Sequence, residues 1–252
     1  MMSKNGRIQG RSACRVLDLD EMQEPFFRKV LQDLEHLVSL ESVSYLHPSK
    51  QWEYPWAMEQ SCLTAGSRVL DAGCGASIFP IYLAHEAFRV SAVDLNPPAG
   101  LDERHGVRVN YAVGDMTRLP WKNDVFDAVF CISVIEHLDV MNMPAALQEI
   151  RRVLKENGRL LLTTDFFADR NAKLRYEGPG EAFDVDWNFF DPKMLEEVVL
   201  NAPGFTVCGS VSIDVDWTSV RRQMRRFHGY PYTSVGVALS KTPDGPDSVT
   251  GR

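Results

Sequence analysis

The sequence predicts an α/β fold built on a doubly wound, mostly parallel sheet, with an antiparallel strand at its C-terminal edge and a helical cap at its N-terminus. After Gly66, short apolar runs alternate with stretches of helical periodicity, which is typical of parallel strands joined by right-handed crossover helices. A glycine-rich turn, Asp71-Ala72-Gly73-Cys74-Gly75, directly follows the first apolar run. Two β-like segments, 205–213 and 234–241, come late in the chain and predict a hairpin at the sheet edge.

The two ends of the chain are predicted to lie outside this sheet. Residues 1 to about 20 are expected to be a loose start, whereas apolar residues at steps of three and four predict an amphipathic helix over 24–40. Residues 241–252 are rich in Pro, Gly, Ser and Asp, which is typical of a disordered tail. The predicted organisation is an N-terminal cap or lid (1–60), a main domain (61–240) with a substrate insertion at about 165–190, and the tail.

Strands and helices alternate through the main domain. Strands are predicted where short apolar runs lie between turn residues, at 68–73, 89–96, 107–115, 126–133 and 159–167. Helices are predicted at 78–87, at 145–158, where Gly158 is expected to close the helix, and at 191–202. In the last of these, Asp191 is the expected N-cap and Pro192 lies in the first turn.

Composition and charge restrict the class of protein. The chain has 252 residues, of which 44% are hydrophobic and 24% charged, as expected of one globular α/β domain. A formal net charge of −7 argues against a large nucleic-acid footprint, because phosphate binding needs an excess of Lys and Arg. One basic run, 221–226, holds four arginines, and it is either a contact for an anionic substrate or the solvated face of a helix.

Five scattered cysteines form no CxxC pair and are odd in number: Cys14, Cys62, Cys74, Cys131 and Cys208. Reduced thiols are the simplest interpretation, which places the protein in the cytoplasm. No apolar run has the length of a signal peptide or of a membrane span, so no membrane association is expected.

The glycine turn favours a particular kind of ligand. Gly73 and Gly75 let the backbone turn tightly and let a ligand approach the carboxyl edge of the sheet. Position 78 is isoleucine, so the GxGxxG pattern for a pyrophosphate is incomplete. Asp71 would repel a pyrophosphate but suits a cationic ligand, and Asp94 at the end of the next strand can accept hydrogen bonds from two ribose hydroxyls. These charges favour S-adenosylmethionine (SAM) over NAD.

Six ordered motifs carry a resemblance to a known family: VLDAGCG (69–75), VSAVDLN (90–96), GDMTRLPW (114–121), FDAVFCISVIEHL (126–138), ALQEIRRVLKENGRLLLTT (146–164) and FFDPKMLEEVV (189–199). In these motifs the chain resembles the class I SAM-dependent methyltransferases, in particular the UbiE/UbiG-like group (methyltransferase type 11). The resemblance implies a Rossmann-like fold and SAM as cofactor.

Carried over residue by residue, the resemblance implies contacts to SAM along the turn. It implies that the turn through Gly73, Cys74 and Gly75 passes beneath the methionyl part of the cofactor and that Asp71 supports its ammonium group. Asp94 would hold the ribose.

The resemblance assigns the adenine end to the next two strands. Leu95 would lie against the adenine ring, Asp115 would accept a hydrogen bond from the adenine amino group, and Met116 would supply a backbone amide. Ile132, just past the fourth strand, would face the cofactor. Each of these acids could instead be a turn or cap residue of its loop.

A general base is needed only where the acceptor keeps its proton. The best candidate is His137, which follows the fourth strand, because an imidazole titrates near neutral pH; its alternative role is a structural hydrogen bond at a helix start. His228 is a second candidate. In some relatives this segment has the sequence ExxEH and binds a divalent metal. In this chain Ser133 occupies the first position of that motif, so no metal site is expected. Glu136 is either structural or directed toward the substrate.

Aromatic residues in the poorly matched segments are the expected acceptor pocket. They lie in 51–56, in 165–190 and in 217–232, and they could stack on a planar or sugar acceptor or form the core of the cap. The insertion contributes Tyr176, Phe183, Trp187 and Phe190. Tyr54 and Trp56 are the preferred candidates for a lid over the cofactor.

The predicted function is therefore SAM-dependent methyl transfer to a small-molecule acceptor, more plausibly at oxygen. Two alternatives remain open: an NAD(P)-dependent oxidoreductase on a Rossmann fold, and a protein that binds SAM without turnover. The incomplete GxGxxG counts against the oxidoreductase. The sequence leaves the acceptor, the methylated atom and the oligomeric state open.

Overall fold

A computed structural model describes residues 12–41, 46–176 and 183–243, and its centre is a nine-stranded sheet. The strand order is β10-β1-β11-β6-β5-β2-β3-β4, with β9 paired to β11. The strands are β1 (Cys14–Val16), β2 (Arg68–Ala72), β3 (Arg89–Asp94), β4 (Val109–Val113), β5 (Phe126–Ile132), β6 (Leu154–Phe166), β9 (Phe205–Val207), β10 (Val211–Ser212) and β11 (Thr233–Lys241). A separate pair joins β7 (Arg175–Tyr176) to β8 (Phe183–Asp184).

The parallel half of the sheet confirms the predicted fold class. Strands β4, β3, β2, β5 and β6 pair in parallel, because each connection between them crosses over the sheet. Strand β11 then runs antiparallel to β6, and β9 pairs antiparallel with β11. The antiparallel strand thus follows the parallel strands as expected, but β1 and β10 continue the sheet beyond it.

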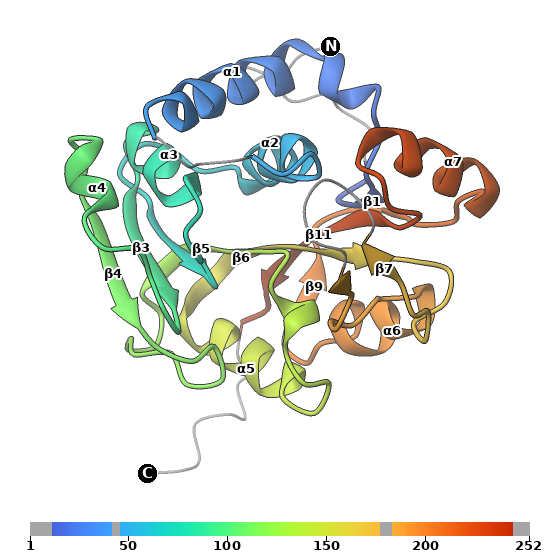
Figure 1. Ribbon diagram of the computed structural model, residues 1–252. Helices are drawn as coiled ribbons and strands as arrows, with labels where there is room; N and C mark the ends of the chain where they lie inside the picture. The colour runs from blue at the N-terminus through green and yellow to red at the C-terminus, as the bar shows by residue number, and fades with distance from the viewer. Residues whose placement is uncertain (1–11, 42–45, 177–182, 244–252) are drawn as a thin grey trace, which may run out of the picture.

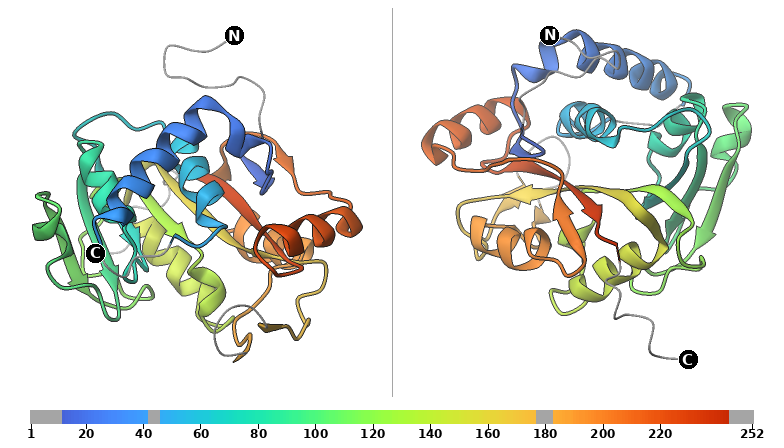
Figure 2. Two further views of the ribbon diagram at one scale, coloured as in Figure 1. Left: turned by 45° about the horizontal axis from the view of Figure 1, so that its top comes forward. Right: turned by 180° about the vertical axis from the view of Figure 1, so that it is seen from behind.

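Helices cover both faces of the sheet (Figure 1). On one face lie α1 (Pro25–Ser39), α2 (Lys50–Ser61) and α3 (Phe79–His85), and on the other lie α5 (Met143–Val153) and α6 (Pro192–Leu195), which continues as the π-helical turn η3 (Glu196–Leu200). Figure 2 shows the same division from behind. The remaining elements are α4 (Leu101–Arg104), α7 (Trp217–Phe227) and two single 3-10 turns, η1 (Glu21–Gln23) and η2 (Ile135–His137).

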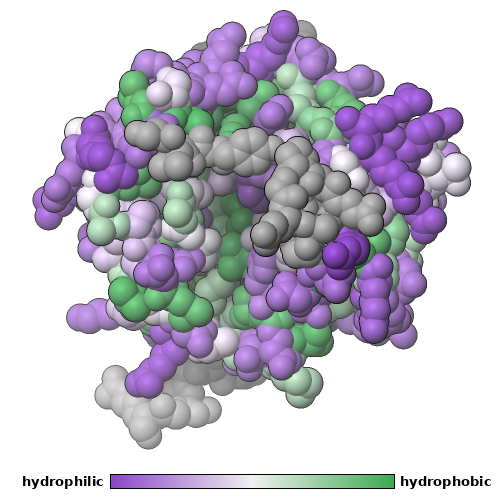
Figure 3. Space-filling view, viewed as in Figure 1, coloured by the Kyte–Doolittle hydropathy of each residue, from purple (hydrophilic) through white to green (hydrophobic). Residues whose placement is uncertain are grey.

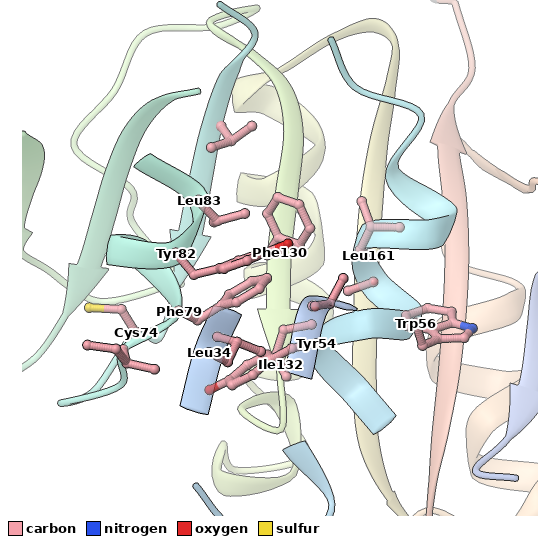
Figure 4. Close-up of a cluster of buried hydrophobic side chains, with 14 of the residues drawn as sticks. Leu34, Tyr54, Trp56, Cys74, Phe79, Tyr82, Leu83, Phe130, Ile132 and Leu161 are labelled. Atoms are coloured by element: carbon pink, nitrogen blue, oxygen red, sulfur yellow. The ribbon is translucent and has the colours of Figure 1, made fainter. Parts of the chain in front are cut away.

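Aromatic side chains fill the core between α2, α3 and the sheet (Figure 4). The Tyr54 and Phe79 rings stack with centroids 4.2 Å apart, and Phe79 meets Phe130 edge to face at 5.3 Å. Trp56 is fully buried and lies directly over Gly236 of β11, where any added Cβ would overlap the indole ring. These contacts attach the N-terminal helices to the sheet, since each fully buried aromatic side chain contributes about 1.5–3 kcal/mol by removal from water.

Three local predictions need correction. The helix predicted at 145–158 ends at Val153, because Leu154 is already extended and pairs with Phe126 of β5. Gly158 therefore does not cap a helix; it lies in β6, where a Cβ would be 2.8 Å from the carbonyl oxygen of Lys155. The loose start to about residue 20 contains β1, which pairs with β11.

At the C-terminal end, Lys241 belongs to β11 rather than to the tail, and its Nζ lies 2.7 Å from Asp124 Oδ1. The rest of the predicted tail beyond residue 243, and residues 1–11, lie outside the described part of the chain. The N-cap prediction is confirmed, since Asp191 Oδ1 accepts a hydrogen bond from the backbone N–H of Met194 at 2.7 Å. No helix within the described ranges is long and apolar enough to cross a membrane.

Candidate functional site

A pocket of about 370 Å³ lies at the carboxyl ends of the parallel strands. Its lining comes from the turns after β2, β3, β4 and β5, because the carboxyl ends of parallel strands share one edge of the sheet. Figure 3 shows that this molecule is hollowed near the centre of the face seen in Figure 1, with hydrophobic residues at the bottom of the hollow. The described lining residues are Gly73, Asp94, Leu95, Gly114, Asp115, Met116, Ser133, Val134, His137 and Leu138.

Gly73 and Gly75 are both favoured by their backbone angles, but only Gly73 is also required by its close neighbours. Gly73 has φ +81°, and a Cβ on it would overlap the side chain of Val134, so no other residue fits there without a shift of the η2 segment. Gly75 has φ +49° but open space around it, so only its backbone angle favours glycine. The backbone N–H groups of Gly73 and Cys74 both donate to the carbonyl oxygen of Val93, at 2.8 and 3.0 Å. The turn after β2 is thereby held against β3.

The Asp94 carboxylate links this turn to the end of β3. Its Oδ2 accepts a hydrogen bond from the Gly75 N–H at 2.8 Å, and its Oδ1 accepts one from the Asn96 N–H at 2.9 Å. A carboxylate has about four lone-pair positions, so two remain for hydroxyl groups of a ligand. Asp94 thus stabilises the loop through two hydrogen bonds and retains lone pairs that can accept from ribose hydroxyls.

The predicted adenine contacts come together at one wall of the pocket. Leu95 is 75% exposed, which leaves its side chain available to a flat ring. Asp115 Oδ1 accepts a hydrogen bond from the Thr117 N–H at 2.8 Å, and Met116 is buried beside it. This wall therefore has an exposed apolar side chain opposite a carboxylate with a free oxygen lone pair.

Asp71 lies behind the turn rather than in the pocket lining. It is 3% exposed, and burial followed by the negative charge of Asp94 raises the pKa of its carboxyl group to about 7, while the charge of Lys50 partly opposes the rise. Two carboxyl groups this close are stabilised by a nearby cation. The two acidic side chains therefore make the surroundings of the glycine turn more favourable to a cation than to an anion.

The remaining cofactor candidates lie outside the pocket lining. Cys74 and Ile132 are buried, 3% and 8% exposed, and burial raises the pKa of the Cys74 thiol, so the thiol is not reactive at neutral pH. Trp56 packs against β11 in the core. Tyr54 is also buried, yet its hydroxyl hydrogen-bonds to the side chain of Ser77 just after the turn. Their direct contact with a cofactor stays a prediction.

The two candidate bases occupy different places. His137, in η2, is exposed and lines the pocket. Partial burial of its ring and then the positive charge of Lys50 lower the pKa of the imidazole. His228 follows α7 and does not line this pocket; burial and then the His47 charge lower its pKa to about 4. Its ring lies 5.5 Å from Tyr230 and 5.4 Å from Tyr232. Of the two, His137 alone is next to the predicted cofactor residues.

A buried polar network, centred on Glu53 of α2, supports the pocket and is absent from the sequence predictions. Glu53 Oε2 accepts from Lys50 Nζ at 2.6 Å and from the Ser133 hydroxyl at 2.9 Å, and Oε1 accepts from the Ser234 hydroxyl at 2.6 Å. The Thr163 hydroxyl is a further donor at 3.3 Å. The partners lie up to 181 residues away in sequence, so no local pattern signals them.

The predicted acceptor segments partly converge on this network. Trp187 donates from Nε1 to Asp165 Oδ2 at 2.7 Å, and its ring lies 5.3 Å from that of His137. Phe190 is fully buried in the sheet core, and the side chains of Tyr176 and Phe183 fall outside the described parts. The basic run 221–226 lies on α7, and its four arginines are exposed. This arrangement agrees with the interpretation of the run as the solvated face of a helix.

Comparisons with known proteins agree with this geometry. Residues 70–162 match the model of a methyltransferase domain. Over 106 residues the chain is 37% identical to a ubiquinone biosynthesis O-methyltransferase of Xanthomonas oryzae, an alignment that covers 40% of this chain and 44% of that relative. The chain thus spans less than half the length of this relative.

Solved structures share the fold. A 1,6-didemethyltoxoflavin-N1-methyltransferase from Burkholderia thailandensis, solved with S-adenosylhomocysteine, aligns with TM-score 0.52 and 20% identity over 89% of this chain and 82% of its own. The [4+2]-cyclase SpnF aligns with TM-score 0.56 and 17% identity over 87% of this chain and 98% of its own. Residues 70–162 thus match a methyltransferase domain, and the chain shares the fold of these solved structures.

Proposed function

We propose that this chain is a SAM-dependent methyltransferase that transfers a methyl group to an oxygen atom of a small-molecule acceptor. The observation that carries the proposal is the charge of the pocket. Its described lining contains two carboxylates, Asp94 and Asp115, and no Lys or Arg, and Asp71 lies just behind the turn. Such a site favours a cationic nucleoside that has no phosphate.

The same geometry argues against the NAD(P)-dependent alternative. A dinucleotide pyrophosphate is bound by free backbone N–H groups at a glycine turn. Here the Gly75 N–H is already donated to the Asp94 carboxylate at 2.8 Å, and the N–H groups of Gly73 and Cys74 are donated to Val93. A pyrophosphate would therefore meet a carboxylate where it needs donors.

The residues present fit SAM. Asp71 would neutralise its ammonium group, Asp94 would accept from its ribose hydroxyls, and Leu95 with Asp115 would hold the adenine. When bound, the sulfonium supplies an activated methyl group for in-line displacement. His137 would take the proton of an acceptor hydroxyl, because its lowered pKa keeps the imidazole neutral at pH 7. Methyl transfer to oxygen is further supported by the name of the Xanthomonas relative.

The proposal includes the cytoplasm as location and no nucleic acid as partner. The sequence holds five scattered cysteines and no CxxC pair, as expected of a reducing compartment. The net charge of −7 and the acidic pocket are unfavourable to phosphate backbones.

Calorimetric titration with SAM, S-adenosylhomocysteine and NAD tests the proposal. We expect micromolar binding of the first two and none of NAD. Asp94→Ala should weaken the binding of both adenosyl compounds at least about tenfold, because it removes one or two charge-assisted hydrogen bonds. Asp94→Asn is the informative partner variant, since its one amide oxygen can still accept from Gly75 and so separates the loop from the ribose contact. Asp214→Ala, at an exposed aspartate, is the control. Binding of NAD, or unchanged SAM affinity in Asp94→Ala, would contradict it.

Binding of SAM should release a proton below pH 7. The Asp71 carboxyl group, with a pKa of about 7, is largely protonated at pH 6 in the free protein, whereas the ligand's ammonium group favours its ionised form. The affinity should therefore rise by up to about tenfold between pH 6 and pH 7.5 and fall once the ligand's α-amino group deprotonates near pH 8. Titrations in buffers of different ionisation enthalpy measure the proton count. In Asp71→Asn the rise should disappear; an equal affinity of the unmodified protein at both pH values would refute this role.

Product formation distinguishes the enzyme from the alternative of a protein that binds SAM without turnover. Formation of S-adenosylhomocysteine from SAM with an acceptor present is expected of the enzyme, and binding without product over a broad acceptor panel is expected of a non-catalytic protein.

A further inference from the structure

Two buried carboxyl groups beside the pocket have no part in the proposed methyl transfer. Glu136 of η2 is fully buried, and neither of its carboxylate oxygens has a hydrogen-bond partner among the described residues. Asp165, near the end of β6, is 8% exposed. A buried carboxyl group without a partner costs about 1–3 kcal/mol or more, so such a group is expected to meet a partner when the protein works.

The cations nearby do not neutralise this pair. Lys50 Nζ lies 2.6 Å from Glu53 Oε2, so its charge is matched by Glu53. Within the described ranges, neither Glu136 nor Asp165 forms a salt bridge. Burial and repulsion by Glu53 raise the pKa of Asp165 to about 7, and burial followed by repulsion from Asp165 raises the pKa of Glu136 well above its usual value. The positive charge of Lys50 partly opposes both rises, but within the described ranges neither acid has a salt-bridge partner of its own.

The surroundings of the pair are aromatic. Trp187 donates from Nε1 to Asp165 Oδ2 at 2.7 Å, and the Tyr232 hydroxyl also hydrogen-bonds to Asp165. Aromatic rings around a carboxylate are a recurrent way to bind an ammonium group, because the ring faces attract the cation. Both rings belong to the segments from which the acceptor pocket is predicted.

The pair is also next to the methyl-transfer site. Asn188 donates from its backbone N–H and from Nδ2 to the Glu136 carbonyl oxygen, at 2.9 and 2.8 Å, which holds the segment 187–189 against η2. The Trp187 ring consequently lies 5.3 Å from the His137 ring, and His137 lines the pocket. A molecule bound beside the Trp187 ring would therefore lie next to the imidazole proposed as base.

We infer that the acceptor carries an amine cation, which Glu136 and Asp165 neutralise and which Trp187 and Tyr232 surround. The inference rests on the proposed function and narrows its substrate class. It explains why two acids are kept buried without a basic partner at the edge of a methyltransferase pocket. An anionic acceptor would be repelled there, and a neutral one would leave the carboxyl pair unmatched.

Three para-substituted phenols, which share the ring and the ethyl chain and differ in the charge of the terminal group, test this inference. Tyramine carries an ammonium group, p-ethylphenol is its neutral counterpart, and phloretic acid carries a carboxylate in its place. Each is titrated calorimetrically into the full chain saturated with S-adenosylhomocysteine. We expect tyramine to bind at least about tenfold more tightly than p-ethylphenol, on the scale of one charge-assisted contact, and phloretic acid to bind least.

Variants assign the preference to the two acids. Asp165→Asn and Glu136→Gln, which keep the shape of each side chain, should each bring tyramine to within about threefold of p-ethylphenol, whereas Glu156→Gln, at an exposed glutamate, should retain the full preference. Unchanged S-adenosylhomocysteine affinity in each variant shows that the fold is kept.

The outcomes separate the two proposals. If S-adenosylhomocysteine itself does not bind, the proposed function fails. If it binds, but p-ethylphenol or phloretic acid binds as well as tyramine, or none of the three binds, the inferred substrate class is overturned and the methyltransferase proposal is unaffected.

Discussion

His137→Gln is expected to lower kcat for a hydroxyl acceptor by roughly 100-fold or more, the usual effect of losing a positioned general base. The side chain is exposed in the pocket, beside Val134 and Ser133, and partial burial lowers its pKa, which favours the neutral imidazole that can accept a proton. SAM affinity should change little, because none of the expected cofactor contacts involves this ring. The measurement is the steady-state rate of S-adenosylhomocysteine formation.

The pH profile distinguishes a base from a structural histidine. The unmodified enzyme should lose activity as the pH falls through the lowered pKa of His137, since the protonated ring cannot accept, and the acid limb should vanish from the residual rate of His137→Gln. His36→Gln, at an exposed histidine on α1, is the matched control and should behave as the unmodified enzyme. A His137→Gln enzyme with full activity and an unchanged acid limb would assign the residue the structural role instead.

The elements that form the pocket were accessible to sequence reasoning because their signals are local. An apolar run buried on both faces predicts a parallel strand, and the turn after β2 must hold Gly73, whose Cβ would overlap Val134. Asp94 ends β3 and Asp115 lies two residues after β4, so their convergence at one edge follows from parallel pairing alone. The six predicted site residues that line the pocket are Gly73, Asp94, Leu95, Asp115, Met116 and His137.

What escaped prediction depends on contacts between distant segments. The sequence left open whether the aromatic residues of 51–56 form a lid or the core of the cap, and the burial of Trp56 over Gly236 of β11 depends on a contact 180 residues away in sequence. Strand β1 is three residues long and is defined only by its pairing with β11 and β10. The break between α5 and β6 follows from the pairing of Leu154 with Phe126, which outweighs the helical pattern.

The Glu53 network is the largest such omission, and it predicts the greatest effect on stability. Glu53→Leu should lower the free energy of unfolding by about 3 kcal/mol, the lower end of the range for a broken buried ion pair, because the Lys50 side chain left behind is still 19% exposed. Three hydroxyl groups, on Ser133, Thr163 and Ser234, lose their acceptor at the same time. Urea unfolding measures the change, with Glu156→Leu as the exposed control.

Removing the cation together with the acid shows whether charge is the cause. Lys50→Leu combined with Glu53→Leu should recover part of the loss, because no unpaired charge is then left buried. Burial alone would raise the pKa of Glu53, but Lys50 and the hydroxyl donors lower it overall, so the contribution of Glu53 is present at neutral pH and is lost as acid protonates the carboxylate. A double variant less stable than Glu53→Leu would show that an unpaired Lys50 charge is not the cause of the loss.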